Sequence, residues 1–488
     1  MGFVLLYIYN PQWIYRFKEV KIETSNTRRP WFQNYLNERG YYVDTNAIEI
    51  IELCNKWYTN TETEFHTAYT LNNEEYTLDK TDFAKRLCED DANLIEIIDI
   101  NATEDSATND IITDILNKNR FDVMYRKQVE QMSANGTVGA YITVANAEIY
   151  EDGSFSGGDI RINYCDSMNI LPLTVINDEI VEVAFVGVNY EKLKKVYVLV
   201  MFLKGQDERY IAETHYFKDT GEEIKDRAQI VQLDVVKPFA IMRNAKVNNL
   251  QMQGYGLPKI WSAIAPLKTI DLTMTMWNRD LLKSDKIVLV NEALMQKDEN
   301  GKIKMNPQMK KIFVQLGRDK LPEEKALWQE YNPTVRTAEV VQSLETALSI
   351  LSMMFGFGTK KYTFESGRIV TATEYIGENQ DAMKEVNSQR KESTAYIQDI
   401  IQAIAYFYEL TQGRKLNINS LDIAIDYDDT YIEDKQSTAQ ALRNDALTFD
   451  IPRLKIMYFM KQYGFTEEEA TELLNEEIQD DGEGDDEE

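Results

Sequence analysis

Histidine and cysteine are scarce in this chain, which has two and three of them among 488 residues. His66 and His215 lie in separate segments, in neither an H-E-x-x-H nor an H-x-E arrangement, which argues against a histidine-centred metallohydrolase. We expect both to be structural or exposed. Cys54, Cys88 and Cys165 are far apart and form no C-x-x-C pair. We therefore expect neither a disulfide framework nor a zinc site, and this cysteine usage fits a reducing cytoplasm.

Signatures of nucleotide hydrolysis and of membrane insertion are also missing. No G-x-x-x-x-G-K-[ST] loop occurs, and Gly356-Phe357-Gly358 lacks the third glycine and the preceding parallel strand of a dinucleotide-binding loop. The apolar run Gly2–Tyr9 is too short to cross a bilayer and has no basic flank or cleavage site. We predict no catalytic residues, no cofactor, no bound metal, no export and no membrane span.

Positive charge is in deficit, since 53 basic residues face 81 acidic ones and the formal net charge is −28. A protein that grips nucleic acid neutralises phosphates with clustered Lys and Arg, so this chain is a poor candidate for tight DNA binding, whereas weak contact is compatible with its charge. Acidity also keeps a large assembly soluble. Residues 479–488 contain no basic residue and are predicted to be a disordered acidic tail.

The first half of the chain divides into a helical part and a β part. Apolar side chains recur at helical spacing in 47–57, 82–100 and 110–132, so residues up to about Asn135 are predicted to be helical, and Gly136 ends that region. Alternating and β-branched runs then predict a mostly antiparallel β region of about a hundred residues, with strands at 141–144, 160–164, 180–186 and 196–202.

Two predicted helices flank a small basic insert. The first, 255–285, has Pro258 in its first turn and should be kinked or divided by Pro266; the second spans 336–355. Residues 286–335 between them form a compact β-rich segment, the most basic long stretch of the chain. Its lysines are expected to dock on acidic protein surfaces, and the candidate partner-binding residues are Lys302, Lys304, Lys310, Lys311 and Arg318. This order indicates a stalk that carries a head at its tip.

Residues 356–370 are the strongest candidate for a functional loop. A connection of this length is uncommon in compact domains and tends to be functional or disordered. It is well placed to touch something that runs past both flanking helices, and its candidate contact residues are Thr359, Lys360, Lys361, Tyr362, Thr363 and Arg368. Its glycines Gly356, Gly358 and Gly367 are interpreted as hinges. The alternative is an ordinary surface hairpin.

The longest helical pattern follows this loop. Thr371 is a suitable N-cap, Glu374 completes a capping box, and Gly413 supplies a C-terminal stop. A helix over 371–412 would be roughly 60 Å long at about 1.5 Å per residue. Beyond it we predict a strand at 421–427 that joins the earlier β region, and closing helices at 438–447, 452–462 and from Thr466 onward.

Carboxylates gather at the end of that strand, at Asp426, Asp428, Asp429, Glu433 and Asp434. Oxygen ligands of this kind hold Ca²⁺ or Mg²⁺, but the glycine and the spacing of an EF-hand are missing. We favour an acidic, solvent-facing strand end. An enzyme that uses Asp426, Asp428 and Asp429 to hold a metal for phosphoryl transfer is the alternative.

Two consecutive motifs resemble a known protein family. Residues Gly358-Thr359-Lys360-Lys361-Tyr362-Thr363-Phe364-Glu365-Ser366-Gly367 and Val370-Thr371-Ala372-Thr373-Glu374-Tyr375-Ile376-Gly377-Glu378-Asn379 look like one segment of tailed-bacteriophage portal proteins. In the branch found in long-tailed phages of Gram-positive hosts, that segment is a short turn, an aromatic strand and a T-A-T-E-x-x-x-E-N helix start. Weaker similarity covers 136–442, and the first hundred or so residues do not share it.

The resemblance implies an α+β portal-type fold. Its parts would be a wing at 1–254, stem helices at 255–285 and 336–355, a clip at 286–335, a tunnel loop at 356–370, a long helix at 371–412, a wing strand at 413–435 and crown helices at 436–478. In that family, twelve subunits form a ring around a channel at one capsid vertex of the virion, after assembly in the host cytoplasm.

The resemblance also implies a passive function. The ring guides double-stranded DNA during packaging and ejection, while a separate terminase hydrolyses ATP. Expected partners are the terminase large subunit, the head-to-tail adaptor, the major capsid and scaffolding proteins, and DNA through weak contacts. Lys360, Lys361 and Arg368 would make brief, salt-sensitive contacts with phosphates, and the insert 286–335 would dock on motor or adaptor. A capsid or tail protein without a channel is a further alternative.

Overall fold

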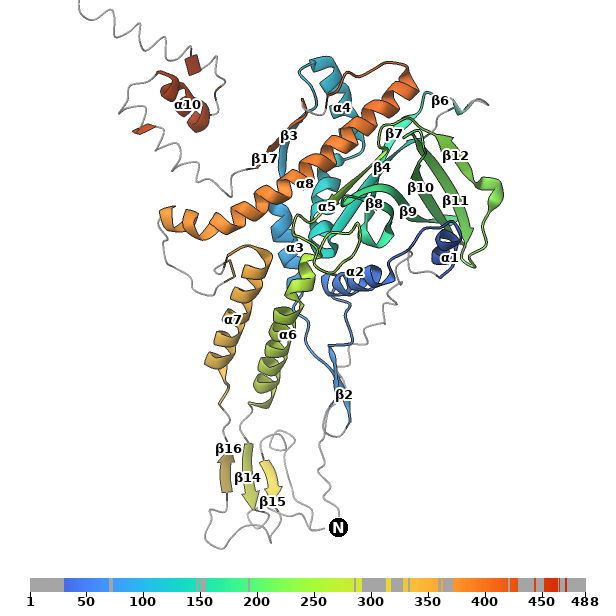
Figure 1. Cartoon of the computed structure of the whole chain (residues 1–488). Coiled ribbons are helices and arrows are strands. Elements are labelled where there is room, and N and C mark those ends of the chain that lie inside the picture. The colour runs from blue at the N-terminus through green and yellow to red at the C-terminus, as the bar shows by residue number, and fades with distance from the viewer. Residues whose placement is uncertain are drawn as a thin grey trace, which may run out of the picture.

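The computed structural model describes residues 30–69, 73–145, 148–149, 155–191, 194–284, 287–291, 313–316, 328–331, 334–358, 361–362, 372–419, 422–428, 443–444, 452–463, 465 and 470–471. Helices and strands are both abundant in these ranges, so the fold is α+β, as predicted. The described parts form a broad body from which a narrow stalk extends (Figure 1).

A five-stranded antiparallel sheet forms one side of the body. Its strand order is β12-β11-β10-β9-β8, and the strands are β8 (Ile170–Ile176), β9 (Glu179–Glu191), β10 (Lys194–Lys204), β11 (Tyr210–Lys218) and β12 (Gln229–Gln232). Successive side chains of a strand point to opposite faces. In β10, Val200 and Phe202 join the main core, whereas Tyr197 and Met201 pack with Phe32 of helix α1 (Pro30–Glu38) on the other face.

A smaller antiparallel sheet lies next to it and completes the predicted β region. Its strand order is β13-β4-β7, with β4 (Thr137–Ala145), β7 (Asp159–Asp166) and β13 (Phe239–Arg243), and a short pair β5 (Glu148–Ile149) and β6 (Phe155–Ser156) falls between β4 and β7 along the chain. The predicted strands at 141–144, 160–164, 180–186 and 196–202 are thus all present, in antiparallel pairs.

The N-terminal region contains more strand than predicted. Helix α2 (Thr45–Tyr58) matches the expectation, but α3 (Phe83–Asn93) is followed by strand β3 (Ile97–Asn101), so the prediction of one helix over 82–100 is wrong. Its isoleucine-rich end fits either periodicity, and β-branched residues favour a strand. The predicted helix 110–132 is two helices, α4 (Ser106–Lys118) and α5 (Phe121–Asn135), because Arg120 adopts a φ of 53°.

Two glycines allow the body to pack closely against the start of the stalk. Gly136 ends α5 with a φ of 86°, as its predicted role as a helix stop requires. A Cβ added at Gly136 would lie 2.2 Å from the carbonyl oxygen of Gly256. The N–H of Gly256 donates to Thr137 Oγ1 at 2.8 Å. No larger residue fits at this contact, which fixes the approach to the stalk against β4.

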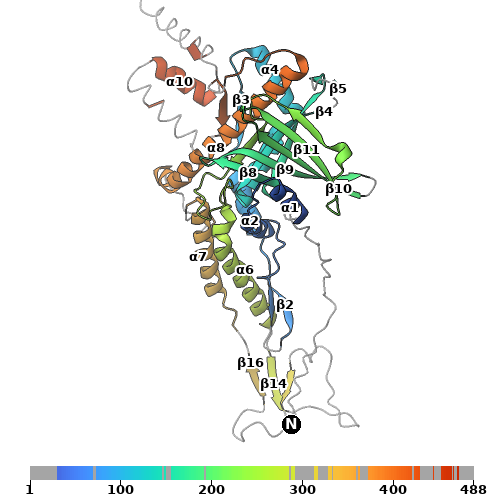
Figure 2. The ribbon, with the colours of Figure 1, turned by 45° about the vertical axis from the view of Figure 1, so that its right-hand side comes forward.

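The stalk consists of two antiparallel helices with a three-stranded sheet at their tip (Figures 1 and 2). Helices α6 (Lys259–Lys283) and α7 (Thr337–Phe355) agree with the predicted ranges, and α6 passes through the buried Pro266 without being divided. The tip sheet has the order β15-β14-β16, with β14 (Ile287–Asn291), β15 (Phe313–Leu316) and β16 (Trp328–Tyr331). A hairpin of β1 (Thr67–Tyr69) and β2 (Glu75–Thr77) lies beside α6, on the side away from α7 (Figures 1 and 2).

Helix α8 (Ala372–Gln412) crosses the body over 41 residues. It ends where predicted, because Gly413 adopts a φ of 67° and its N–H donates to the carbonyl oxygen of Glu409 at 2.8 Å. The C-terminal half of α8 enters the main core with Tyr396, Ile400 and Ile404. Thr371, the predicted N-cap, lies outside the described residues.

The strand predicted at 421–427 is present as β17 (Ala424–Tyr427), but its predicted partner is wrong. It pairs antiparallel with β3, not with the β region that begins at residue 137. Alternation along a sequence identifies a strand but says nothing about the edge to which it is added. The pairing of β17 with β3 links the segment that follows α8 to the N-terminal region.

The last described helix is α10 (Pro452–Tyr463), close to the predicted 452–462. Most of the predicted helix 438–447, the predicted capped helix from Thr466 and the acidic tail 479–488 lie outside the described residues. Within the described ranges, none of the helices combines the length and the apolar character that a bilayer span needs.

Candidate functional site

The predicted functional loop begins where α7 ends, and the structure describes part of it. Lys361 is exposed, with its ammonium 5.6 Å from the ring centroid of Phe357. The other basic, threonine and glycine candidates of the loop beyond Gly358 lie outside the described residues, namely Thr359, Lys360, Thr363, Gly367 and Arg368. The same holds for the candidates of the insert, Lys302, Lys304, Lys310, Lys311 and Arg318.

Gly356 ends α7 and touches a carboxylate of α8. Its φ of 86° is left-handed, and its N–H donates to the carbonyl oxygen of Met353 at 3.1 Å. A Cβ added at Gly356 would lie 1.9 Å from Glu385 Oε2. Gly356 therefore serves close packing as well as chain reversal. Its role as a hinge, like that of Gly358, stays a prediction.

Tyr362 is anchored on α3. Its hydroxyl donates to Asp90 Oδ2 at 2.6 Å, and its ring meets those of Phe83 and Phe357 edge-on, with centroids 6.4 Å and 6.3 Å away. Burial and the hydrogen bond to Asp90 raise the pKa of the phenol well above its ordinary value. Arg86 binds the other Asp90 oxygen at 2.9 Å. The hydroxyl of Tyr362 is therefore bound within the subunit, and its predicted contact with DNA stays a prediction.

Beneath the loop, four charged side chains form what we call the charge cluster: Lys246, Lys259, Asp91 and Glu385. Lys259 Nζ lies 2.7 Å from Asp91 Oδ1 and 3.0 Å from Glu385 Oε1. Lys246 Nζ lies 3.0 Å from the same Glu385 oxygen and donates to the carbonyl oxygen of Met354 at 3.0 Å. Lys259 and Asp91 are each only 3% exposed. Two lysines thus balance two carboxylates, of which Lys259 and Asp91 are buried and Lys246 and Glu385 are half-buried.

The charge cluster joins the stalk, the long helix and the base of the loop. Lys246 satisfies a backbone acceptor at the C-terminal end of α7, where a cation is also favoured by the helix dipole. Burial opposes the charged form of Lys259, but Asp91 and Glu385 outweigh burial and raise its pKa. Removing one partner from such a buried pair costs about 3 kcal/mol or more, because an unpaired charge is left behind. The cluster therefore fixes how α3, α6 and α8 meet.

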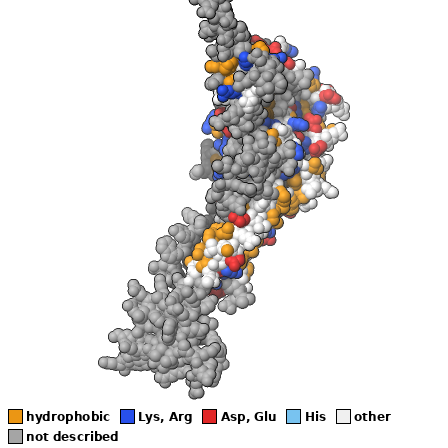
Figure 3. Space-filling model, turned by 90° about the vertical axis from the view of Figure 1, so that its left-hand side faces the viewer, with side chains coloured by type: hydrophobic (Ala, Val, Ile, Leu, Met, Phe, Trp, Pro, Cys, Tyr) orange, Lys and Arg blue, Asp and Glu red, His pale blue; other side chains and the backbone are white. Residues whose placement is uncertain are grey.

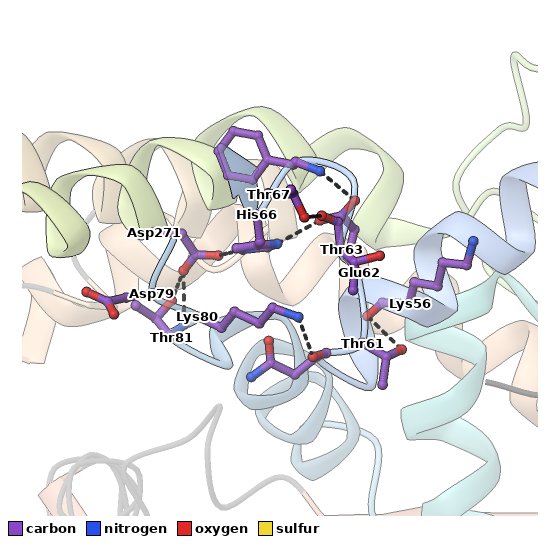
Figure 4. A network of polar contacts seen from close by, with 12 residues as sticks. Lys56, Thr61, Glu62, Thr63, His66, Thr67, Asp79, Lys80, Thr81 and Asp271 are labelled. Atoms are coloured by element: carbon purple, nitrogen blue, oxygen red, sulfur yellow. Dashed lines mark hydrogen bonds and ion pairs between the residues drawn. The ribbon is translucent and has the colours of Figure 1, made fainter. Parts of the chain in front are cut away.

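A second buried network joins the segment before the hairpin to the stalk (Figure 4). His66 is 1% exposed, and its Nδ1 and Nε2 lie 2.7 Å from Glu62 Oε2 and 2.8 Å from Asp271 Oδ2. Thr81 donates its N–H and its hydroxyl to Asp271 Oδ1, at 3.0 Å and 2.6 Å. His66 is therefore structural, one of the two placements predicted for it.

Electrostatics favour the protonated form of His66 in this network. Burial lowers its pKa, but the hydrogen bonds to Asp271 and Glu62 outweigh burial and raise it. Burial raises the pKa of Glu62, but the hydrogen bond to His66 and a backbone N–H lower it overall. Burial lowers the pKa of Lys80. Its ammonium interacts electrostatically with both carboxylates and donates to the carbonyl oxygen of Asn60 at 3.2 Å. The two carboxylates thus favour the imidazolium form of His66 between them.

His215 has a comparable environment on the five-stranded sheet. Its Nε2 lies 3.2 Å from Glu213 Oε2 and its Nδ1 lies 2.8 Å from Glu223 Oε1, while Arg39 Nη1 also binds Glu213, at 2.5 Å. The hydrogen bond to Glu213 outweighs burial and raises the pKa of His215, and that carboxyl has a pKa lowered to about 2 by His215 and Arg39. Like His66, it is buried and paired.

The carboxylates at the end of β17 are spread out in the described part of the structure. Asp426 is exposed and lies opposite Asp99 of β3, while the carbonyl oxygen of Asp428 accepts a hydrogen bond from Arg390 Nη2 at 2.9 Å. Asp429 lies outside the described residues. Within the ranges that the structure describes, no group of three His, Cys, Asp or Glu side chains is arranged to hold a metal ion.

Both buried networks escaped the sequence analysis, although weak signals for them exist. Asp90 and Asp91 interrupt the apolar stripe of α3, and Lys259 opens an apolar helix, so each marks a charge that packing forces inside. Glu62 and His66 are four residues apart, a spacing that brings side chains together within a helical turn. The polar N-terminal half of α8 gives no such signal for Glu385.

Comparison with known proteins does not assign this chain to a family. Neither a protein-family model nor a curated protein matches this chain.

Proposed function

We propose that this chain is the subunit of a portal-type ring, through whose centre double-stranded DNA passes. The observation that carries the proposal is the order of parts: α6 and α7 hold a three-stranded sheet at their tip, and the loop after α7 leads into a helix of 41 residues across the body. This order is the one that the motif resemblance at 358–379 implies. The wing, stem, clip, tunnel-loop and crown assignments belong to this proposal.

The surface of the stalk supports an oligomer. One face of it, which we call the uncharged stalk face, is exposed and consists mainly of uncharged side chains: Ala265, Thr269, Leu272 and Met276 on α6, and Gln342, Ser343, Thr346, Ile350 and Met353 on α7. Several of these residues from both helices line a shared shallow groove, whose one charged lining residue is Glu339. Leu272 is 44% exposed and Met353 is 55% exposed. Figure 3 shows hydrophobic and uncharged side chains along the stalk, and such patches mark protein interfaces.

The net charge of the chain favours a channel through which DNA moves over a protein that binds DNA tightly. A channel that bound phosphates strongly would brake a moving duplex, and a net charge of −28 works against such binding. In the proposal, Lys360, Lys361 and Arg368 make brief contacts with DNA, and the basic insert docks on the packaging motor and later on the adaptor. The subunit itself is not an enzyme, and a separate terminase hydrolyses ATP.

Negative-stain electron microscopy of the purified full chain tests the proposal. We expect closed rings with a central hole, and we expect Leu272→Asp combined with Ile350→Asp to abolish them by placing charge in the uncharged stalk face. Tyr190→Asp is the matched control, because Tyr190 is 67% exposed on β9, away from the stalk. Monomers or open filaments of the unaltered chain would contradict the proposal and favour a capsid or tail protein without a channel.

A further inference from the structure

We propose that the β1–β2 hairpin of one subunit packs against the N-terminal half of α7 in the next subunit of the ring. This inference rests on the proposed ring and adds the residues that join neighbouring stalks.

The hairpin is fixed to the α6 helix of its own subunit. The Arg279 guanidinium lies 4.2 Å above the ring centroid of Tyr76. The Asp79 N–H donates to Thr275 Oγ1, and Asn278 Nδ2 donates to Asp79 Oδ2, each at 2.8 Å. With the buried His66 network at Asp271, these contacts follow α6 for two turns. The hairpin is therefore part of the stalk.

One face of the hairpin packs against α6, and the opposite face is exposed. Pairing places Ala68 across from Tyr76 on the half-buried face that meets α6, whereas Tyr69 lies across from Glu75 on the opposite face. Tyr69 is 59% exposed, and Glu75 and Thr77 are also exposed. Packing on α6 covers one face of the hairpin, and no third strand of this sheet covers the other face within the described residues. A partner on the outer face would supply the missing cover.

The arrangement of the stalk identifies that partner. Across the stalk the order is α7, α6 and hairpin in both views of the ribbon (Figures 1 and 2). In a ring, each subunit places one side against the opposite side of the next. In the proposed ring, we take the α7 side and the hairpin side as the two sides that meet neighbouring subunits. Ring closure therefore brings the hairpin of one subunit to α7 of its neighbour.

Height along the stalk and charge agree with this pairing. Arg336 binds Asp280 Oδ2 through Nε at 2.9 Å and Nη2 at 2.7 Å, so α7 begins at the level where Arg279 covers Tyr76. Rotation about a ring axis keeps each residue at its height. The exposed Glu75 would thus face the N-terminal end of α7, which carries partial positive charge and the guanidinium of Arg336. Arg336, which also binds Asp280, and the helix N-terminus attract Glu75, whereas Glu339 in the first turn of α7 opposes it.

Disulfide trapping in the full chain tests the inference. Thr77 and Ala338 are both exposed, at similar heights, and the variant Thr77→Cys with Ala338→Cys should form covalent multimers when its rings are oxidised. The native Cys54 and Cys88 are buried and Cys165 is half-buried. The control pair, Thr77→Cys with Asp226→Cys, places the second thiol on the exposed wing and should give no multimers above background.

The outcomes separate the two proposals. Rings that form normally while the Thr77→Cys with Ala338→Cys pair cross-links no faster than the control pair would overturn the hairpin contact and leave the ring intact. Failure of the unaltered chain to form rings would overturn both. In the cross-linking background, Glu75→Lys should slow multimer formation several-fold by repulsion from the partner subunit's Arg336, whereas Glu38→Lys, on the exposed end of α1, should not; equal rates would refute the charge contact.

Discussion

Gly356 and Gly40 have nearly the same backbone conformation but different surroundings. Their φ angles are 86° and 87°, yet a Cβ at Gly40 would meet nothing within 4 Å, while one at Gly356 would collide with the carboxylate of Glu385. An alanine in the left-handed region costs about 1 kcal/mol by itself. At Gly356 it must also push Glu385 away from Lys246 and Lys259.

We expect Gly356→Ala to lower the free energy of unfolding by about 3 kcal/mol, against about 1 kcal/mol for Gly40→Ala. The difference measures how firmly the charge cluster holds the carboxylate of Glu385. Chemical denaturation of the full chain, followed by far-ultraviolet circular dichroism, compares the two variants. Equal losses would mean that Glu385 can move aside without leaving its lysines.

For single residues, the sequence predicts the backbone conformation better than it predicts which distant residues they contact. Gly136 and Gly413 were expected to end helices, and both do, because a left-handed residue after an apolar helical pattern is a local requirement. That Gly136 faces Gly256, or that Gly356 faces Glu385, depends on segments far apart in the chain. The hydrogen bond from Tyr362 to Asp90 was missed for the same reason, since Asp90 lies on α3, far from Tyr362 in the chain.

Among the elements, the attachment of the hairpin to α6 should depend on pH. His66 has a pKa raised above 6.5, so the stability that its protonated form supplies is fully present below pH 6.5 and is lost as pH rises through the raised value. Glu62 has a pKa lowered from 4.5, so its contribution is present above pH 4.5 and is lost as pH falls through the lowered value. The attachment is strongest between these limits.

Hydrogen exchange of the segment 62–81 checks this expectation. After correction for the intrinsic rates, protection of the segment should fall as pH rises above 6.5 through the raised pKa of His66 in the unaltered chain, and His66→Gln should remove most of that change. His215→Gln is the matched control, because His215 also has a raised pKa but lies on β11. An unchanged pH profile in His66→Gln would show that the histidine does not hold the hairpin.

Helices were easier to predict than strand partners. The ranges of α7 and α8 agree with their predictions almost to the residue, because capping residues and long apolar periodicity are local. The strand β3 and the partner of β17 were missed, since β-branched runs fit two periodicities and pairing is non-local. The charged networks that hold the elements together were not predictable, because each draws single residues from three or more segments.

For the molecule as a whole, the proposed ring makes the loop residues act together. Replacing Lys360, Lys361 and Arg368 with Ser removes three cations from each subunit, and this loss is repeated in every subunit of the ring. We expect rings of normal appearance that package or retain less DNA, with the defect dependent on salt, because the lost contacts are with phosphates. The DNA content of purified particles is the measurement.

A control for this variant removes the same charge elsewhere. Lys194, Lys218 and Lys225 are exposed, on β10, on β11 and just after β11, and their replacement with Ser should leave DNA content unchanged. Undiminished filling of particles that carry the loop variant would exclude a role for these three cations in handling DNA.

The pairing of β3 with β17 also determines when the chain can finish folding. Ala424 pairs with Asn101, so about 320 residues must be synthesised after β3 before its partner exists. At about 5 to 20 residues per second, β3 waits on the ribosome for roughly 15 to 65 s with its edge open. Ile98, which is 66% exposed even in the folded chain, makes that edge prone to aggregation, and the charge of Asp99 next to it opposes wrong pairing during the delay. Synthesis rate and chaperone supply should therefore limit the yield of this protein more than its final stability does.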